Sequence, residues 1–118
     1  MSTVASPQRR SHHERLDQAF FALSNRTRRK LLTRLGTAPL RLSDLAAPLD
    51  MTLPAASKHL KVLERARLVR RSVEGREHWF SLNPRALDEA QAWLQRNRIF
   101  WEDTLRSLAA HVEDEPRG

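Results

Sequence analysis

The segment that decides the fold is LSDLAAPLDMTLPAASKHLKVLER, residues 42–65. It predicts a short helix, a tight turn and a second helix. Pro48 should end the first helix because proline interrupts the hydrogen-bond ladder. Thr52 is an N-cap residue for the second helix, with Pro54 in its first turn. We expect Ser43 to cap the first helix. Two helices joined in this way are typical of a helix-turn-helix.

The second of these helices is amphipathic. At 100° per residue, Ala56, Leu60 and Leu63 share one side, which we expect to face the core. The opposite side carries residues that can reach base edges or phosphates, and Ala55 is small enough to approach a thymine methyl group. His59 lies between the two sides, where we favour packing over a phosphate contact. We therefore predict DNA contacts by Thr52, Pro54, Ala55, Ser57, Lys58, Lys61 and Arg65.

A β-hairpin is predicted directly after this helix, in LVRRSVEGREHWFSL, residues 68–82. Two strands, 68–73 and 77–82, flank Glu74-Gly75, and glycine supplies the positive φ of a two-residue turn. A helix-turn-helix followed by a basic hairpin, or wing, is a shape that reads duplex DNA. The hairpin arginines either keep an exposed edge soluble or contact DNA, including the minor groove. As DNA contacts we predict Arg70, Arg71 and Arg76.

Two helices are predicted ahead of this unit. The first begins at Glu14 and has one apolar face, from which Phe21 departs, so that Phe21 would be exposed in a monomer. Asn25 can cap the second helix, which we expect to end at Gly36. A cationic group crowds the solvent side of the second helix and is either a solvated face or a phosphate contact. This group is Arg26, Arg28, Arg29 and Lys30.

A long last helix is predicted from Asn83-Pro84 to about Val112, because a cap residue and an N1 proline start it and no breaker follows. At 1.5 Å per residue it would be ~40 Å long, more than so small a domain can cover. Its apolar residues need a second surface, most simply a twofold-related copy. We predict a homodimer through the first and last helices, with an interface of Leu16, Phe20, Phe21, Trp93, Phe100, Trp101, Leu105 and Leu108.

The composition limits the classes of function. The 118 residues suit one domain, and Lys+Arg 21 against Asp+Glu 14 give a net charge of +7, which favours nucleic acid as the partner. The sequence has no Cys, which excludes disulfides, thiolate metal sites and thiol catalysis. It shows neither an apolar run of ~18 residues nor a secretory signal, and no phosphate loop or nucleophile elbow. We expect a cytoplasmic protein without membrane association that is not an enzyme.

Potential metal ligands cluster near the N-terminus, but we favour a polar arm that enters an exposed helix start over a metal site. We likewise expect His111 near Glu115 to be a surface pair, and His78 to pack or hydrogen-bond within the sheet. We therefore predict no bound metal and no cofactor. The N-terminal cluster is His12, His13, Glu14 and Asp17.

Three segments are expected along the chain. Residues 1–13 form a flexible basic arm, and residues 14–112 form the winged helix-turn-helix domain, which binds DNA and dimerises. Residues 113–118 form an acidic, frayed tail. The predicted fold class is mainly α with a small β-hairpin.

Three stretches together resemble the ArsR (SmtB-like) winged-helix repressors of bacteria and archaea. They are ALSNRTRRKLLTRL, LSDLAAPLDMTLPAASKHLKVLERARLVRR and EGREHWFSLNP. The resemblance covers about residues 14–112, and the SKHLKVLERARLV segment with its spacing to the wing is its most specific part. It implies a homodimer that binds inverted repeats near promoters and usually represses. It also implies an inducer that lowers DNA affinity when it binds the dimer.

The metal sites of that family are absent or incomplete in this sequence. One type uses a Cys-x-Cys motif on the first helix of the helix-turn-helix, where this chain has LSDLAAPL. Another pairs Asp-x-His with a downstream His-x-x-Glu on the last helix. Here Asp103 lacks its histidine, whereas His111 and Asp114 or Glu115 are present, so half of that site remains. The segment AWLQRNRIFWEDTLRSL resembles the metal-independent branch of the family.

The sequence therefore predicts a sequence-specific, DNA-binding transcriptional regulator, a dimeric repressor of an inverted-repeat operator. The alternative is a sensor repressor that responds to a metal through His, Asp and Glu residues, or to an organic ligand in an aromatic pocket at the dimer interface. The predicted partners are double-stranded operator DNA, a second copy of the chain and an unidentified small-molecule effector. A nonspecific nucleic-acid coating protein is a third hypothesis, which competition against random duplex would separate from the first.

Overall fold

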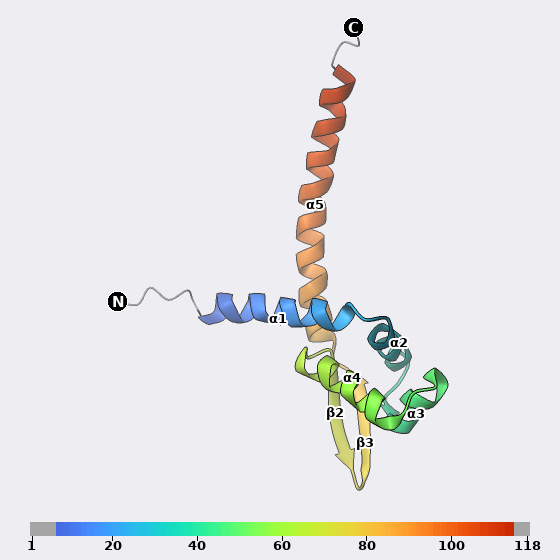
Figure 1. The fold of residues 1–118 in the computed structure, drawn as a ribbon. Coiled ribbons are helices and arrows are strands. Elements are labelled where there is room, and N and C mark those ends of the chain that lie inside the picture. Colours follow the sequence, from blue (N-terminus) through green and yellow to red (C-terminus); the bar gives the residue numbers. More distant parts are fainter. Residues whose placement is uncertain (1–6, 115–118) are drawn as a thin grey trace.

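The computed structural model describes residues 7–114, which form five α-helices, one short 3₁₀ turn and a three-stranded antiparallel sheet. Helices α2 to α4 and the sheet make a body from which the long helix α5 projects, and α1 passes across the base of α5 (Figure 1). The predicted fold class, mainly α with a small β-hairpin, is confirmed.

Helix α1 spans Pro7–Leu23, so it begins earlier than the predicted start at Glu14. The segment between the two starts contains no glycine or internal proline, and proline itself is favoured in a first helical turn. The predicted arm is therefore helical from Pro7 onward, and residues 1–6 lie outside the described part of the chain. Helix α1 carries the buried Leu16, Ala19 and Ala22 on one face.

Helix α2 spans Arg26–Leu35 and starts as predicted. Asn25 is its N-cap, and the side-chain Oδ1 accepts a hydrogen bond from the N–H of Arg28 at 3.0 Å. Gly36 is the C-cap, also as predicted, but its φ is −64°. The end of α2 therefore does not use the left-handed conformation that makes glycine common after helices.

Helix α3 spans Leu42–Ala46 and is followed by the 3₁₀ turn η1, Ala47–Leu49. The prediction that Ser43 caps α3 is wrong, because the N-cap is Arg41 and no side chain caps the helix. Strand β1 runs directly into the helix, so the last strand residue occupies the cap position. Asp50 adopts a left-handed φ of 53° and redirects the chain toward α4.

The sheet has the order β1-β3-β2, and all its pairs are antiparallel. Strands β2, Val69–Glu74, and β3, Glu77–Leu82, are the predicted hairpin. Strand β1, Leu40–Arg41, was not predicted, because two residues are too few to show the alternation of a strand. It pairs with β3 and thereby joins the wing to the start of α3.

The turn of the hairpin lies one residue later than predicted. Glu74 pairs with Glu77, so the two turn residues are Gly75 and Arg76 rather than Glu74 and Gly75. Gly75 has a φ of +64°, which confirms the reason for expecting glycine there. The shift places Arg76 at the tip of the wing.

The core lies where α1 to α4, the base of the sheet and the first turns of α5 meet. Helix α4, Leu53–Arg65, contributes the side predicted to be buried, Ala56, Leu60 and Leu63. Burying a leucine side chain stabilises a fold by about 1.5–3 kcal/mol, so this side fixes how α4 lies in the body. The largest fully buried side chains are Leu31, Leu45, Leu60, Leu63 and Leu68.

Helix α5 spans Pro84–Asp114, 31 residues and so about 46 Å. Asn83 helps to start it as predicted, because its Oδ1 accepts a hydrogen bond from the N–H of Arg85 at 3.3 Å. Ala86 and Ala90 in its first turns are buried, whereas its distal half extends away from the body (Figure 1). None of the helices within residues 7–114 is both long and apolar enough to cross a membrane.

Candidate nucleic-acid interface

Helix α4 is the central element of the candidate interface, and local signals in the sequence build it. The Oγ1 of its N-cap, Thr52, accepts a hydrogen bond from the N–H of Ala55 at 3.2 Å. Pro54 lies in the first turn, where its missing N–H costs nothing. Because the apolar side of the helix is sealed in the core, the other side has a fixed direction.

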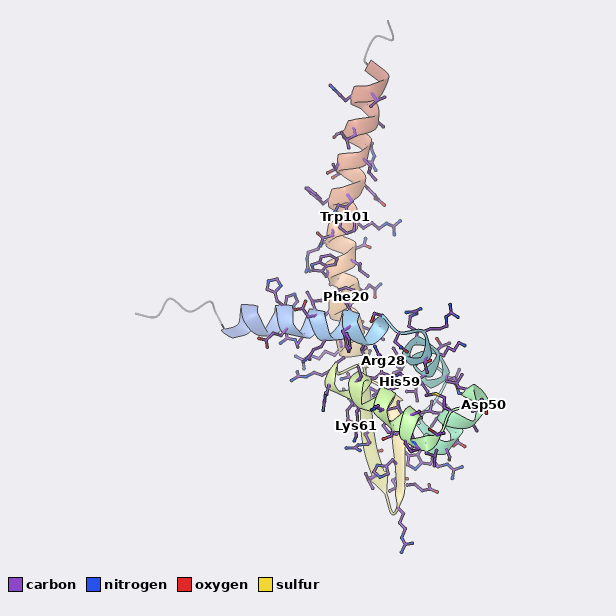
Figure 2. The ribbon with its side chains drawn as sticks, viewed as in Figure 1. Phe20, Arg28, Asp50, His59, Lys61 and Trp101 are labelled. Atoms are coloured by element: carbon purple, nitrogen blue, oxygen red, sulfur yellow. The ribbon has the colours of Figure 1, made fainter. Side chains whose placement is uncertain are left out.

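That other side of α4 is open to solvent. Lys58, Lys61 and Arg65 are exposed, and Ser57 is half-buried next to them. Among the described side chains, none of these three cations forms an ion pair with a carboxylate. Figure 2 shows Lys61 on the side of α4 that faces away from α2 and α3. The predicted contacts from this helix therefore lie on one uncovered face, with Thr52 and Pro54 exposed at its start and Ala55 half-buried.

The tip of the wing lies close to the starts of α3 and α4. Arg76 is exposed in the turn and borders a groove of about 210 Å³ together with Leu53, the first residue of α4. A groove between a wing and a recognition helix suits one sugar–phosphate strand of a duplex. The groove is lined by Arg41, Leu42, Ser43, Leu53, Arg76, Glu77 and His78.

Arg70 and Arg71 lie nearer the base of the wing than Arg76, and each has a partner within the chain. One guanidinium nitrogen of Arg70 donates to Oδ1 of Asn83 at 3.2 Å. Arg71 forms an ion pair with Glu64 of α4, with 3.6 Å between Nε and Oε2. Both side chains remain exposed, so they can still reach a phosphate, but they also hold the wing against α4 and the start of α5.

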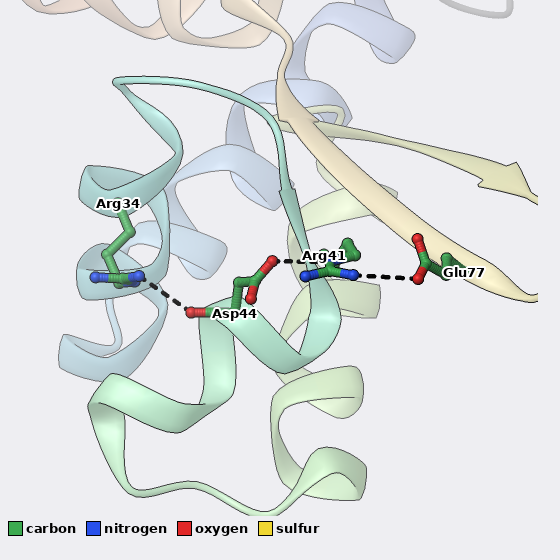
Figure 3. A network of polar contacts seen from close by, with 4 residues as sticks. All are labelled: Arg34, Arg41, Asp44 and Glu77. Atoms are coloured by element: carbon green, nitrogen blue, oxygen red, sulfur yellow. Dashed lines mark hydrogen bonds and ion pairs between the residues drawn. The ribbon is translucent and has the colours of Figure 1, made fainter.

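A polar network fixes the wing to the helix-turn-helix (Figure 3). The Nε of Arg41 donates to Oδ2 of Asp44 in α3 at 3.0 Å, and its Nη1 donates to Oε1 of Glu77 in β3 at 3.1 Å. Its guanidinium also lies 5.7 Å from the ring centroid of Trp79. Arg34 of α2 donates from Nη2 to the backbone carbonyl of Asp44 at 3.0 Å.

Electrostatics stabilise the ionised forms within this network. The hydrogen bond from Arg41 is the main cause that lowers the pKa of Asp44 below its usual value of 3.8. Its hydrogen bonds to Asp44 and then to Glu77 raise the pKa of Arg41. The network is partly exposed to solvent, so it orients the wing more than it stabilises the fold.

The sequence predicts that the whole cationic group on α2 is exposed, and this is only partly correct. Arg26, Arg29 and Lys30 are exposed, but Arg28 is buried, with 7% of its surface accessible. Its guanidinium donates to two backbone carbonyls at the end of α1 and also meets His59 of α4 (Figure 2). Burial is the main cause that lowers the pKa of His59, followed by the charges of Arg28 and Lys58. His59 is half-buried and packed, as predicted.

Comparison with known proteins identifies this arrangement. A family model described as a helix-turn-helix domain matches residues 23–72. The HTH-type transcriptional regulator Rv2034 of Mycobacterium tuberculosis is 36% identical over 115 residues, which cover 98% of this chain and 96% of that protein. The ArsR-like transcriptional regulator from Rhodococcus sp. RHA1 is similar in structure, with a TM-score of 0.75 and 30% identity over 89% of this chain and 99% of that one. The chain is a member of the ArsR family. It is a DNA-binding transcriptional regulator with a winged helix-turn-helix fold.

A further relative of this ArsR-family regulator is the transcriptional repressor SdpR of Bacillus subtilis. It is 29% identical over 79 residues, which cover 67% of this chain and 88% of that protein. The shared segment shows that the likeness extends to a second named regulator.

The residues predicted to form the dimer interface of the ArsR-family regulator lie on α1 and α5, and most of them are uncovered in the single chain. The exposed fractions of Phe21 and Leu105 are 63% and 64%, and Phe100, Trp101 and Leu108 are exposed as well. Leu16 differs, since it is 5% exposed and already packed inside the chain. Phe20 and Trp93 are half-buried against each other, with ring centroids 5.8 Å apart, and Trp93 meets Trp101 at 6.2 Å.

An open groove of about 550 Å³ lies between α1 and α5 of the regulator, lined by His13, Leu16, Asp17, Phe20 and Trp93. Among the described residues, no three His, Asp or Glu side chains are grouped so as to hold a metal ion. His12, His13, Glu14 and Asp17, for which a polar arm was favoured over a metal site, form no such group. The pairing of His111 with Glu115 lies partly outside the described residues, as does any role of Asp114 and Glu115 side chains.

Sequence reasoning missed the contacts of two arginines next to the candidate interface of the regulator. Arg28 falls three, four and seven residues before Leu31, Leu32 and Leu35, which is the spacing of one helical face, so this signal could have identified it as inward-facing. Arg41 had no such signal, because two of its three partners, Glu77 and Trp79, lie far along the sequence on β3. His78 was expected to pack within the sheet but is exposed near the tip of the hairpin, where it is paired with Val73 in the register.

Proposed function

We propose that the protein is a dimeric repressor that binds an inverted-repeat operator, with α4 of each protomer in a major groove and the wing beside it. One observation carries this proposal. The apolar side of α4 is locked in the core, whereas its opposite side presents three exposed cations that lack carboxylate partners among the described residues. A helix held in this way is suited to enter a groove of DNA.

The residues would divide into base readers and backbone contacts. Ser57 and Lys58 lie in the first half of α4, where side chains of a recognition helix meet base edges. Thr52, Pro54 and Ala55 would allow the start of the helix to approach closely. The cations further along α4 and on the wing would meet phosphates, which set affinity and register without reading the sequence. These backbone contacts are Lys61, Arg65, Arg70, Arg71 and Arg76.

The second half of the proposal is a twofold dimer through α1 and α5. Exposed apolar surface on the distal half of α5 supports it, because soluble monomers rarely leave such a surface uncovered. A twofold pair would present two recognition helices about one turn of DNA apart, ~34–36 Å, which matches an inverted repeat. Phe21 and Trp101 would lie in this interface, and Leu16 would support it from inside the protomer.

Whether the protein represses or activates, and where it acts in the cell, are proposed from its relatives. We propose repression, because one relative is named as a transcriptional repressor. We also propose a cytoplasmic location, where the relatives from bacteria would meet DNA, and no enzymatic activity. The family and the class of partner support these points, and the geometry of α4 does not bear on them.

Titration of the protein with an operator duplex tests the assignment of readers. A footprint on the promoter of its own gene would first define the operator. Lys58→Ala should then relax base preference at one position of each half-site, by about 1–3 kcal/mol of discrimination. Arg76→Ala should instead weaken binding to all duplexes similarly, because a wing-tip cation mainly meets backbone.

Ionic strength provides the matching control for this experiment. The log–log slope of affinity against salt should become less steep by about 0.9 for each phosphate contact removed, so Arg76→Ala should change it. If Arg76→Ala altered base preference and Lys58→Ala did not, the roles assigned to the two residues would be reversed. A protein that prefers its operator over random duplex by less than ~10³-fold would not be a sequence-specific regulator.

We propose the groove between α1 and α5 as the place where a small-molecule effector would bind. The aromatic side chains of Phe20 and Trp93 in its lining, together with Asp17, support an organic ligand more than a metal. Indole can serve as a probe, with methyl resonances followed by NMR. Leu16 should shift and the distant Leu63 should not. Shifts of both residues, or of neither, would remove the groove from consideration.

A further inference from the structure

Arg28 is the only buried charged residue among those the structure describes, and 7% of its surface is accessible. A buried cation is costly unless hydrogen-bonding partners replace the water it loses. No carboxylate forms an ion pair with it in the described part of the chain. Its partners must therefore be neutral groups, and they come from two different helices.

The first two partners are at the end of α1. The Nε of Arg28 donates to the carbonyl of Ala22 at 2.8 Å, and its Nη2 donates to the carbonyl of Phe21 at 3.0 Å. The last carbonyls of a helix have no partner within the helix, and the negative end of the helix dipole favours a cation. The guanidinium also lies 5.1 Å from the ring centroid of Phe21. Arg28 thus fixes the end of α1 to α2.

The third partner is on α4. The Nη1 of Arg28 lies 3.4 Å from Nδ1 of His59, and arginine can only donate, so Nδ1 of a neutral imidazole is the acceptor. His59 is the residue after Lys58, on the border between the buried and the outer side of α4. One guanidinium therefore joins the end of α1 to the middle of the recognition helix (Figure 2).

Only arginine can make this connection. Its planar guanidinium carries five N–H donors in a rigid fork, so it can meet three acceptors in fixed directions at once. Lysine would keep the charge but has a single nitrogen at the end of a flexible chain. Replacing Arg28 by lysine would therefore remove the geometry of the connection and keep its charge.

We infer that Arg28 is a positioning residue for DNA recognition, which sets the orientation of α4 against α1 through His59 and thereby aligns Lys58 with the bases. The inference rests on the proposed role of α4 as the reading helix. Reading bases requires bidentate geometry, whereas binding phosphates requires mainly charge. Loss of the connection therefore lowers specific binding and leaves sequence-independent binding almost unchanged.

Arg28→Lys tests this inference in the full-length protein. Affinities for the operator and for a random duplex of the same length are measured well below the melting temperature. Operator affinity should fall at least tenfold, and affinity for random duplex should change less than threefold. Equal losses on both duplexes, or no loss on either, would show that Arg28 has no part in positioning α4.

Arg29→Lys is the matched control. Arg29 is on the same helix and donates from Nη1 to the carbonyl of Leu23 at 2.7 Å, also at the end of α1, but it is exposed and none of its hydrogen bonds reaches α4. The ratio of specific to random affinity should be unchanged in this variant. If it fell as far as in Arg28→Lys, capping of α1 and not the contact with His59 would be responsible, and the inference would be wrong.

Two variants of His59 address the case in which Arg28→Lys does not fold. His59→Gln keeps an acceptor for Arg28 and should preserve specificity, whereas His59→Leu removes the acceptor and should lower operator affinity about tenfold. The same result for both would contradict the inference. If the wild type itself did not discriminate the operator from random duplex, the proposed function would be wrong. Failure of the inference about Arg28 and failure of the proposed function are therefore distinguishable.

Discussion

The winged helix-turn-helix body and the distal half of α5 contain the same kinds of residue in opposite environments. Leu31, Leu45 and Leu60 of the body are almost completely buried within one chain. Leu105 and Leu108 of α5 have exposed fractions of 64% and 55%. The body packs its leucines within one chain, against α1 and the first turns of α5, whereas the distal half of α5 carries apolar surface that the chain itself does not cover. The same type of side chain therefore packs within the chain in one region and remains available to a second surface in the other.

Truncation of one leucine in the body and one in the distal half of α5 should give the largest difference in effect. Leu31→Ala should lower the free energy of unfolding by about 2–5 kcal/mol, because it leaves a cavity in a packed core. Leu108→Ala should cost less than about 0.5 kcal/mol at protein concentrations where the chain is monomeric. Urea denaturation at several protein concentrations measures both. An equal cost at the lowest concentration would mean that α5 is covered within the single chain.

A charge on the uncovered side of α5 tests whether a second copy covers it. Leu105→Glu should raise the dimer dissociation constant about 100-fold, because a carboxylate would be buried without a partner. Sedimentation equilibrium gives this constant directly. Ala110→Glu adds the same charge on the opposite side of the helix, where its side chain is exposed, and should leave dimerisation unchanged. Equal effects of the two variants would argue against an interface on this side.

Substitution of one lysine on the outer side of α4 and one on the cationic side of α2 tests which side contacts phosphates. Lys61→Gln should make the salt slope of DNA binding less steep by about 0.9, since one phosphate contact is lost. Lys30→Gln should not change the slope. Lys30 borders a different groove, with Pro48 and Leu49, away from the wing tip. A changed slope for Lys30→Gln would instead support the alternative that α2 contacts phosphates.

The smallest expected effect concerns the attachment of the wing to the body. The pKa of Asp44 is lowered by Arg41, so its contribution to stability is present above the usual pKa of 3.8 and is lost as the pH falls through the lower, folded-state pKa. Asp44→Asn should therefore lower the melting temperature slightly at neutral pH, and the difference from wild type should vanish in strong acid. A difference that persists there would mean that the carboxylate charge is unimportant.

Much of the body could be predicted because its signals are local. The caps Asn25 and Thr52, the proline in the first turn of α4 and the glycine of the wing turn each act within a few residues. The uncovered side of α5 was also predictable, from its length and its apolar spacing. For these elements the sequence contains both the pattern and its cause.

The remaining features depend on contacts between distant elements. Strand β1 exists because Leu40 pairs with Phe80 of β3, and no pattern within two residues can show that. The guanidinium of Arg28 is buried because carbonyls at the end of another helix accept hydrogen bonds from it, which composition alone cannot show. The role of Arg41 depends on contacts with both α3 and the wing, which only the folded chain brings together.

The order in which a ribosome makes the chain gives the α1–α5 contact a further consequence. Arg15 of α1 pairs with Glu89 of α5 at 3.1 Å, and Phe20 packs against Trp93, so the first helix completes its contacts only after the last one has been made. During synthesis the body can fold while α1 still lacks its neighbour. A surface that α1 and α5 build together therefore forms only after α5 has been synthesised.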